Sequence, residues 1–313
     1  MQTDETGQTD DAYQELRPLL FSIAYRMVGS VSEAEDLVQE AFLRFHRAVR
    51  KGTTIGSPKA YLSATVTRLA INHLQSARVR REQYVGTWLP EPLLTSPDDE
   101  TTRHAETADS LSMAFMVLLE RLSPVERAVL VLREVLGYSY GEIAEMVGKS
   151  EENSRQIFAR AHRHVEARKP RFEASRERRE ELARRFFAAV EEGDTQGLVG
   201  MLSTDAVMYG DGGGKAPAIR DPLHGGERVA RFMAGLGRQG QRMDVRLVLT
   251  EINGQPGSLV MDPEGRLLNA FALDIVDGEV HTVRSIVNPD KLGHLGEVAD
   301  VTQLLRDRGP AGS

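Results

Sequence analysis

Apolar residues recur every three or four positions through residues 12–82, a spacing that predicts amphipathic helices. The first helix shows it at Leu16, Leu20, Ile23 and Met27. Ser32 and Glu35 have the spacing of a capping box and predict the start of a second helix. Ser57 and Pro58 offer an N-cap followed by a first-turn proline, which predicts the start of a third, long helix. The segment is therefore expected to form a helical domain.

The helical pattern stops between residues 83 and 108. WLPEP at 88–92 and SPDDE at 96–100 contain prolines that cannot continue a helix. Acidic side chains outnumber basic ones in this stretch, so we interpret it as an acidic linker. A solvated tether is the simplest alternative for such a composition.

Residues 109–168 return to helical spacing, and Ser123 with Glu126 predicts a capping box at the start of one helix. The segment also contains the pattern of a helix-turn-helix. Tyr140–Val147 is expected to be a short helix, Gly148 permits a left-handed turn, and Ser150 caps a second helix. The inward positions are predicted at Ile143, Ala144, Val147, Ile157, Ala161 and Val165. The outward Arg155, Gln156 and Arg160 suit the major groove, where Arg and Gln bond purine edges. A helical hairpin with a solvated charged face fits the same pattern, so both interpretations stay open at this point.

A second basic group lies at the end of the long helix that starts near Ser57. Its candidate DNA-binding residues are Arg68, Asn72, His73, Arg78, Arg80 and Arg81, with Tyr61 and Tyr84 on either side. Arginines neutralise phosphate, while polar and aromatic groups hold bases. Arginines that complement the helix dipole at a solvated helix end explain the same cluster, and taken singly this explanation is preferred.

From about residue 178 the chain changes to short alternating segments and glycine-rich turns. A helix over Leu182–Val190 precedes strand candidates at 245–249 and 267–276. Asp277–Gly278, between the last two strand candidates, is a hairpin signal. Helices followed by a mostly antiparallel sheet predict a separate α+β domain.

Composition narrows the functions open to the chain. Its 313 residues suffice for about two or three domains. The sequence contains no cysteine, which excludes disulfides and cysteine-ligated metals and fits a reducing cytosol. The N-terminal sequence lacks the features of a secretory signal, and no apolar stretch approaches the roughly 18 residues that span a bilayer. The net charge of -7 argues against a general nucleic-acid binder, although a basic face still binds phosphate on an acidic protein.

The order of these segments resembles extracytoplasmic-function sigma factors, group IV of the sigma-70 family. Residues 32–48 are similar to their polymerase-binding helix, 57–82 to their −10 recognition helix, and 119–165 to their −35-binding domain. The C-terminal part resembles a SnoaL-like domain with a cone fold. WLPEP, DGGGK at 211–215 and NPDKL at 288–292 match the subfamily that carries this fusion. The three motifs in this order are highly specific.

The resemblance implies two all-α sigma domains, the second with a helix-turn-helix, followed by an α+β SnoaL-like cone domain. The expected bounds are 10–85 for the sigma-two domain, 86–108 for the acidic linker, 109–170 for the sigma-four domain, 178–295 for the SnoaL-like domain and 296–313 for a tail.

A sigma factor lends promoter specificity to an enzyme and catalyses nothing itself. The implied partners are core RNA polymerase, through its β′ clamp helices and β flap, and promoter DNA, through the −10 and −35 elements. No membrane, metal or cofactor is expected, the cytoplasm is the expected location, and a separate anti-sigma factor stays an open question. The residues that match the β′-docking face are Asp36, Gln39, Glu40 and Arg44, which also fit the exposed side of an amphipathic helix. Asn72 and Arg68 depart from the residues that relatives more often carry, aspartate and asparagine respectively.

The resemblance also implies regulation in cis, with the SnoaL-like domain packed against the sigma-two domain and the linker. The interdomain residues expected from the three motifs are Trp88, Leu89, Pro90, Glu91, Pro92, Asp211, Gly212, Gly213, Gly214, Lys215, Asn288, Pro289, Asp290, Lys291 and Leu292. Glycines 212–214 would let the backbone approach a partner closely.

Two other functions stay open on the sequence. One is a transcriptional regulator with a ligand-binding module; the other is a polyketide-cyclase-type enzyme with a DNA-binding appendage. The candidate catalytic groups are Asp205, Tyr209, Asp211, His224, Asp274 and His281, since an Asp–His pair can act as general acid and base. We favour turn and strand-surface roles for all six, because their spacing shows no convergent pair.

Overall fold

The structure is a computed structural model that describes residues 3–82, 84–95, 110–167 and 175–308, with side chains described from residue 13 and excluding 77–82, 307 and 308. The chain divides into two compact units. The first consists of Met1–Glu82, Pro97–Leu111 and Phe115–Lys169. The second consists of Gln83–Ser96, Ser112–Ala114 and Pro170–Ser313. Within the described residues, every helix is too short or too polar to cross a membrane.

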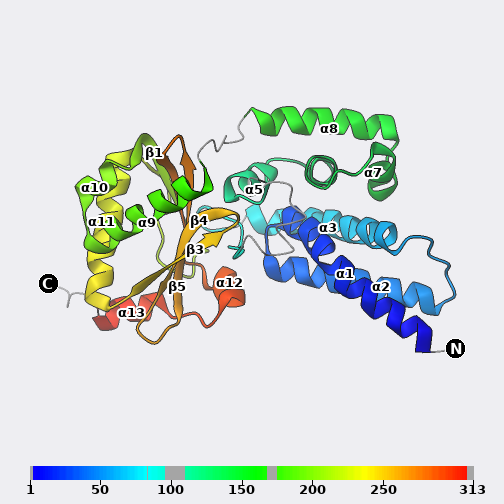
Figure 1. Cartoon of the computed structure of the whole chain (residues 1–313), viewed down its shortest axis with the longest axis horizontal. Coiled ribbons are helices and arrows are strands. Elements are labelled where there is room, and N and C mark those ends of the chain that lie inside the picture. Colours follow the sequence, from blue (N-terminus) through cyan, green and yellow to red (C-terminus); the bar gives the residue numbers. More distant parts are fainter. Residues whose placement is uncertain (1–2, 83, 96–109, 168–174, 309–313) are drawn as a thin grey trace. The chain divides into compact units, whose positions relative to one another are not determined.

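Three helices begin the first unit: α1 (Thr3–Val28), α2 (Val31–Arg50) and α3 (Pro58–Glu82), each packed on the other two (Figure 1). Helix α2 is capped by Ser30, whose hydroxyl accepts the Glu33 amide at 3.2 Å. The predicted cap at Ser32 is therefore wrong by two residues. Ser30 takes the extended backbone of an N-cap, so the helix has already begun when the chain reaches Ser32.

The second helical group comprises α5 (Met113–Leu119), α6 (Pro124–Leu130), the π-helical turn η2 (Val131–Val135), α7 (Tyr140–Val147) and α8 (Glu151–Glu166). The predicted capping box of Ser123 and Glu126 is present, and so is the left-handed Gly148 between α7 and α8. Ser150 caps α8, and Ile157, Ala161 and Val165 are buried as predicted. On α7, Met146 is buried in place of the predicted Val147.

Two buried arginines join these helical groups. The Arg26 guanidinium, on α1, donates to the hydroxyl of Ser22 and to the carbonyl of Ser110. Arg127, on α6, donates to the carbonyls of Leu119 and Met27. Burial lowers the pKa of Arg26 to about 10 and that of Arg127 to about 9, so both remain charged at neutral pH. Buried charges of this kind need these acceptors, which hold α1 against the second group.

The second unit is a six-stranded sheet with helices packed on it. In chain order its elements are α9 (Arg176–Glu192), α10 (Thr195–Val199), β1 (Leu202–Asp211), β2 (Leu223–His224), α11 (Gly226–Met243), β3 (Arg246–Ile252), β4 (Gln255–Met261), β5 (Leu267–Val276), β6 (Glu279–Ile286), α12 (Pro289–Leu292), η3 (Gly293–Leu295) and α13 (Val301–Arg308). The strand order is β2-β1-β6-β5-β4-β3, antiparallel except for the β1–β6 pair.

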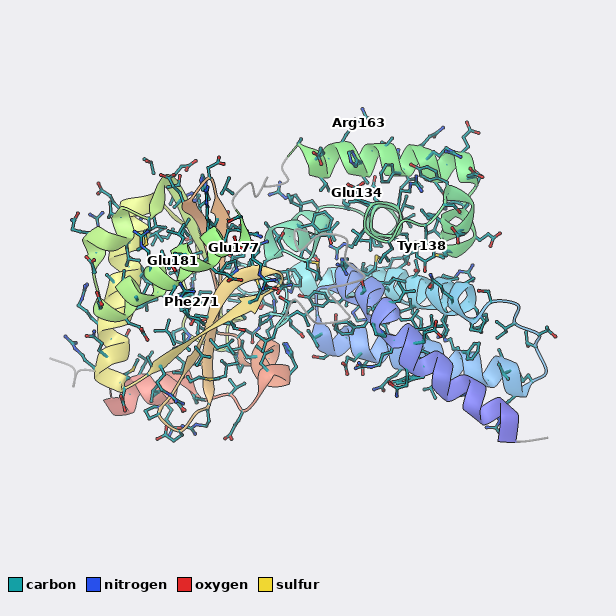
Figure 2. The ribbon with its side chains drawn as sticks, in the orientation of Figure 1. Glu134, Tyr138, Arg163, Glu177, Glu181 and Phe271 are labelled. Atoms are coloured by element: carbon teal, nitrogen blue, oxygen red, sulfur yellow. The ribbon has the colours of Figure 1, made fainter. Side chains whose placement is uncertain are left out.

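Asp277 and Gly278 form the predicted hairpin turn, and both have the positive φ that such a turn requires. The core lies between α9, α10, α11 and one face of β1, β5 and β6. Phe271, labelled in Figure 2, belongs to it, with its ring centroid 6.4 Å from that of Phe187. The two all-α segments and the α+β domain are therefore those expected from the sequence.

The linker residues 84–95 pack within the second unit. Leu94 forms an antiparallel bridge with Ile252. On either side of it, the Asn253 amide donates to the carbonyl of Leu93 at 2.8 Å, and the Thr95 amide donates to that of Glu251 at 3.1 Å. The alternative of a solvated tether is thus wrong for this part of the linker, while SPDDE at 96–100 lies outside the described residues.

Candidate functional site

A buried carboxylate, Asp211, connects the three sequence motifs. It is the last residue of β1, and its side chain is fully buried. Its Oδ1 accepts the hydroxyl of Tyr84, and its Oδ2 accepts the backbone amide of Leu89 at 2.8 Å. Nζ of Lys291 lies 2.7 Å from the same Oδ2. DGGGK, WLPEP and NPDKL therefore meet at one carboxylate.

Lys291 is the cation of this cluster and is itself 6% exposed. Its ammonium donates to Asp211 and to the carbonyl of Leu89. It also lies 4.4 Å from the ring centroid of Trp88 and 4.9 Å from that of Tyr84. Ring faces attract a cation, so two aromatic linker residues help to hold this buried charge.

Asn288 completes the cluster from the start of α12. Its Nδ2 donates to the Tyr84 hydroxyl at 2.9 Å, and its Oδ1 accepts the Asp290 amide at 3.1 Å, which caps the helix. Gly213 has φ of 58°, and a Cβ atom there would lie 2.3 Å from Asn288 Nδ2. Glycine is therefore required at this position. We call Tyr84, Trp88, Leu89, Asp211, Asn288 and Lys291 the linker anchor.

The environment of Tyr84 keeps its phenol protonated. Burial and the adjacent Asp211 carboxylate both raise the pKa of Tyr84 well above its ordinary value. The phenol thus stays protonated and donates to Asp211 across the physiological pH range. In the sequence Tyr84 lies beside the predicted DNA-binding cluster, and only the fold brings it to Asp211, 127 positions away.

The remaining motif residues surround the anchor. Leu89, Pro90, Glu91, Pro92 and Leu292 are buried. His294 contacts the Pro92 carbonyl at 2.8 Å. Lys215 and Asp290 form an ion pair of 2.5 Å in which both side chains are more than half exposed. The Lys215–Asp290 ion pair thus lies at the solvent-exposed edge of the linker anchor, whereas the Asp211–Lys291 ion pair is buried within it.

The predicted polymerase-docking residues share one face of α2. Asp36, Gln39 and Arg44 are exposed, and Arg44 pairs with Glu40 at 2.7 Å. The Arg44 hydrogen bond lowers the pKa of Glu40 below its usual range. Leu43 lies among them and is 50% exposed, a residue that sequence analysis missed. Leu43 follows Gln39 by four positions and Asp36 by seven, and this spacing places all three residues on the same face of a helix.

The predicted −35 residues Arg155, Gln156 and Arg160 are exposed on α8. The Arg155 guanidinium lies 4.5 Å from the ring centroid of Tyr140, on α7, and is hydrogen-bonded to Glu151. Arg163, labelled on α8 in Figure 2, is also exposed. Three arginines, Arg155, Arg160 and Arg163, therefore lie on the exposed surface of α8, the second helix of the helix-turn-helix.

The predicted −10 residues lie on α3. The Arg68 guanidinium donates to the carbonyls of Met146 at 2.9 Å and Glu145 at 2.6 Å, at the C-terminal end of α7. Asn72 is exposed, and Nε2 of His73 is 3.0 Å from Glu33. The side chains of Arg78, Arg80 and Arg81 lie outside the described residues.

The six candidate catalytic groups have several different partners. Asp274 pairs with Arg284 at 2.5 Å, and both are buried. Asp205 accepts a hydrogen bond from Ser203, which lowers the pKa of that carboxyl. The expectation of turn or strand-surface positions is wrong for Asp211 and Asp274, because both are buried and paired with a cation. Tyr209 and His281 are half-buried on strands, and His224 is exposed.

Known proteins resemble the chain along most of its length. The family model for Sigma-70 region 2 matches residues 12–80, and that for Sigma-70, region 4 matches residues 112–165. The ECF RNA polymerase sigma factor SigJ of Mycobacterium tuberculosis is 36% identical over 89% of this chain and 91% of its own length. The probable ECF sigma factor SigI of the same organism is 30% identical over 91% and 94%. The crystal structure of M. tuberculosis SigJ superposes with a TM-score of 0.71 at 33% identity, covering 90% of this chain and 97% of that one.

Proposed function

Because this chain belongs to the extracytoplasmic-function sigma factors of the sigma-70 family, we propose that its SnoaL-like domain restrains transcription initiation by holding the linker in the linker anchor. The chain is a sigma factor that binds core RNA polymerase and directs promoter-specific initiation. Its own carboxylate–lysine pair, Asp211 and Lys291, supports the regulatory step, since both members contact linker residues.

The restraint follows from what the linker would otherwise do. In a sigma factor, an acidic linker suits the basic path near the polymerase active site and RNA exit, which normally holds nucleic acid. Residues 84–95 cannot lie in that path while they are bound to β3, to the turn that follows it and to the other members of the linker anchor. Release of the linker is therefore the step that activates the protein.

The remaining surfaces have complementary roles in this proposal. The α2 face of Asp36, Gln39, Glu40 and Arg44 docks on the β′ clamp helices, with Leu43 as its apolar centre. The second helical group binds the β flap and presents Arg155, Gln156 and Arg160 to the −35 element. Helix α3 captures the −10 element through Asn72, His73 and the arginines that follow.

Arg68 has two competing partners in this proposal. Its guanidinium is bound to the carbonyl end of α7, a favourable position for a cation. Engaging −10 DNA requires Arg68 to leave these carbonyls, so DNA capture and release of α3 from α7 are coupled.

We assign the SnoaL-like domain a regulatory and not a catalytic role, in the cytoplasm where core polymerase acts. Asp211 and Asp274 are buried and each pairs with a cation of the same domain, so both carboxylates are engaged in holding the fold together.

Transcription in vitro with core polymerase on one promoter tests the proposal. The three proteins to compare are the full-length chain, a chain that ends before Asn288, and a chain that ends after residue 175. Ending before Asn288 removes Lys291 but keeps Asp211, and should raise transcription about fivefold or more at equal concentration. Ending after residue 175 also removes the surface on which the linker packs, and should give a different level. Indistinguishable activity of the three proteins would refute regulation in cis.

A further inference from the structure

The sheet of the second unit ends at β3, which pairs with β4 on one side and borders no other strand of the described residues on its other side. The linker covers only the last part of this open edge, through the bridge of Leu94 with Ile252 and the two backbone hydrogen bonds that flank it. Unpaired N–H and C=O groups along a sheet edge are a template for a further strand. The part of β3 that the linker leaves uncovered is therefore a candidate binding site.

Backbone groups of β3 point to this open edge at every second residue. Along an antiparallel strand, the backbone groups bond alternately to one neighbour and to the opposite side. The Glu251 carbonyl points to the open edge, where it accepts the Thr95 amide at 3.1 Å. Leu249 and Leu247, two and four positions earlier, therefore point to the same edge. Within the described residues, their N–H and C=O groups have no hydrogen-bond partner there.

Two exposed apolar side chains lie beside these open backbone groups. Val248 is 44% exposed and Leu249 is 47% exposed. Successive side chains of a strand point to opposite faces, so the edge is apolar on both faces. Edge strands commonly carry charges that discourage pairing, but the charged residues of β3 are Arg246 and Glu251, at or near its two ends, and Glu251 is paired with Arg176 at 2.9 Å. The centre of the edge is thus open to an incoming strand.

The sequence of the linker is unsuited to pairing further along this edge. Continued in the register of its bridge, the linker would set Pro97 opposite Leu249 and Asp98 opposite Val248. Proline has no N–H to donate to the edge, and an aspartate beside valine would lose hydration without gaining a partner. A strand without these two residues would form more hydrogen bonds with β3 and would cover more apolar surface than the linker does.

We propose that the open edge of β3 binds an extended, antiparallel strand of a partner protein, which replaces residues 93–95 on the sheet and thereby displaces the linker. Main-chain hydrogen bonds give such a strand its affinity, and alternate side chains give it specificity. The tethered linker competes at an effective concentration on the order of millimolar. The added contacts at Leu249 and Val248 are what favour the partner over the linker.

The residues of β3 define the sequence of the partner strand. An apolar residue lies opposite Ile252, as Leu94 does. The next residue is Ser or Thr, because its hydroxyl reproduces the 2.7 Å hydrogen bond from Thr95 to the Glu251 carboxylate. The residue two positions further on is not proline, and an apolar residue follows it opposite Val248.

The binding site is independent of the proposed function, and only its effect on transcription rests on it. A strand that binds only when the linker is released shifts the population of the protein toward the released state. If release of the linker activates this sigma factor, the partner strand is an activator.

Two fluorescein-labelled peptides test the site by fluorescence anisotropy with the full-length protein. One has the sequence of residues 91–100, and the other has the same sequence with Pro97→Thr and Asp98→Val. The substituted peptide should bind saturably and about tenfold or more tightly than the peptide of natural sequence, because it gains an N–H opposite Leu249 and an apolar contact with Val248.

Variants of the protein test the same contacts from the other side. Leu249→Pro removes an N–H that faces the open edge, where proline is tolerated, and Val248→Lys places a charge there. Each should weaken binding of the substituted peptide about tenfold or more. The matched control is Phe232→Lys on α11, also an exposed apolar position, which should leave binding within about twofold. Thermal melting checks that each variant is folded.

Displacement of the linker is tested with the double variant Leu94→Cys, Ile252→Cys. Its disulfide holds the linker on β3, so the oxidised protein should bind the substituted peptide about tenfold or more weakly than the reduced protein. Transcription at a saturating peptide concentration tests the proposed function separately. Binding that leaves transcription unchanged would support the site and contradict regulation by the linker.

The proposal is overturned if the substituted peptide does not bind saturably or binds no more tightly than the peptide of natural sequence. It is also overturned if the edge variants that fold bind like the natural protein, or if the oxidised and reduced double variants bind equally. Analytical ultracentrifugation tests the other occupant of such an edge: a dimer that Val248→Lys dissociates would assign the edge to a second copy of the chain and overturn the proposal as well.

Discussion

The ammonium of Lys291 lies 2.7 Å from a carboxylate oxygen of Asp211, although 80 residues separate them in the sequence. Their side chains are 8% and 0% exposed. Both also bind the backbone of Leu89, so the ion pair holds this linker residue by its backbone amide and its backbone carbonyl.

Lys291→Ala should be strongly destabilising, because it leaves a buried carboxylate without its cation. The expected loss is about 3–5 kcal/mol in the free energy of unfolding, measured by urea denaturation of the second unit's transition. Lys215→Ala is the matched control: this lysine also pairs with an aspartate, but on the surface, and should cost only about 0–1 kcal/mol. Equal losses of unfolding free energy for the two variants would show that the buried Asp211–Lys291 pair contributes no more to stability than the exposed Lys215–Asp290 pair.

Tyr84→Phe removes the hydroxyl that joins Asp211 to Asn288 and should cost about 1–3 kcal/mol in unfolding free energy. The pH dependence has a defined sign. Since the folded-state pKa of Tyr84 is raised, its contribution to stability is complete below the ordinary tyrosine pKa and is lost as pH rises through the raised value. Absorbance at 295 nm during an alkaline titration should therefore be the same for the natural protein and Tyr84→Phe up to about pH 11. If the natural protein showed one more tyrosinate than Tyr84→Phe near pH 10, Tyr84 would ionise like an ordinary tyrosine, which would contradict its raised pKa.

Alanine substitutions on α8 should separate base readers from phosphate contacts. Replacing Arg155, Gln156 or Arg160 should weaken promoter binding by about 1–3 kcal/mol where the side chain reads a base, with specificity relaxed at one −35 position. A phosphate contact would instead weaken all promoters alike and reduce the salt dependence. Arg184→Ala on α9 is the control, an exposed arginine outside this group. Unchanged binding of every −35 variant by all three proteins would exclude α8 as the recognition helix.

Two glycines of α11 should respond oppositely to alanine. A Cβ at Gly237 would lie 1.6 Å from the Val190 carbonyl oxygen, so Gly237→Ala must separate α9 from α11 and should cost about 1–3 kcal/mol or more. At Gly235 a Cβ meets no atom within 4 Å, and alanine there should stabilise the helix by roughly 0.5–1 kcal/mol. Thermal denaturation of both variants measures the difference, and a similar change in both would mean that α9 and α11 are not in close contact.

Local signals in the sequence predicted local structure well. Ser123 with Glu126, Gly148, Ser150 and Asp277–Gly278 each occupy the predicted cap or turn, because these geometries depend on a few adjacent residues. The N-cap of α2 was misplaced because Ser30 and Ser32 offer the same hydroxyl. The preceding Gly29 turns the chain with φ of 71°, and this selects Ser30.

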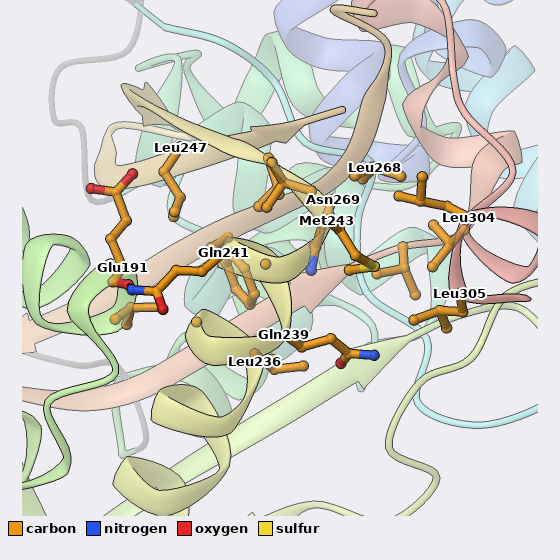
Figure 3. A pocket seen from close by; sticks show the side chains of 18 of the residues that line it. Glu191, Leu236, Gln239, Gln241, Met243, Leu247, Leu268, Asn269, Leu304 and Leu305 are labelled. Atoms are coloured by element: carbon orange, nitrogen blue, oxygen red, sulfur yellow. The ribbon is translucent and has the colours of Figure 1, made fainter. Parts of the chain in front are cut away.

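Long-range contacts were predicted less completely. The three motifs indicated which segments come together, but not that Asp211 is buried at their centre. Tyr84 lies outside WLPEP, and its hydroxyl reaches Asp211 only when residues 84–95 pack on the folded sheet. Helix α11, helix α13 and the sheet enclose a cavity of about 790 Å³ beside Asn269 (Figure 3), which has no sequence signature, because its lining residues are mostly ordinary apolar positions of separate elements.

A reversible cross-link between linker and sheet tests whether the held linker restrains initiation. Leu94 and Ile252 are partners in an antiparallel bridge, and the flanking hydrogen bonds make them a non-hydrogen-bonded pair. Such pairs have Cα atoms roughly 4.5 Å apart, within the range that a disulfide spans. The chain has no cysteine of its own, so Leu94→Cys with Ile252→Cys introduces a single possible disulfide.

The measurement is transcription from one promoter by core polymerase with this double variant, oxidised and then reduced, beside the natural protein under the same two conditions. If the held linker restrains initiation, the oxidised variant should be inactive or nearly so, and reduction should restore transcription about fivefold or more, with the natural protein unaffected. Equal transcription by the oxidised and reduced variant would contradict the claim that release of residues 84–95 activates this sigma factor.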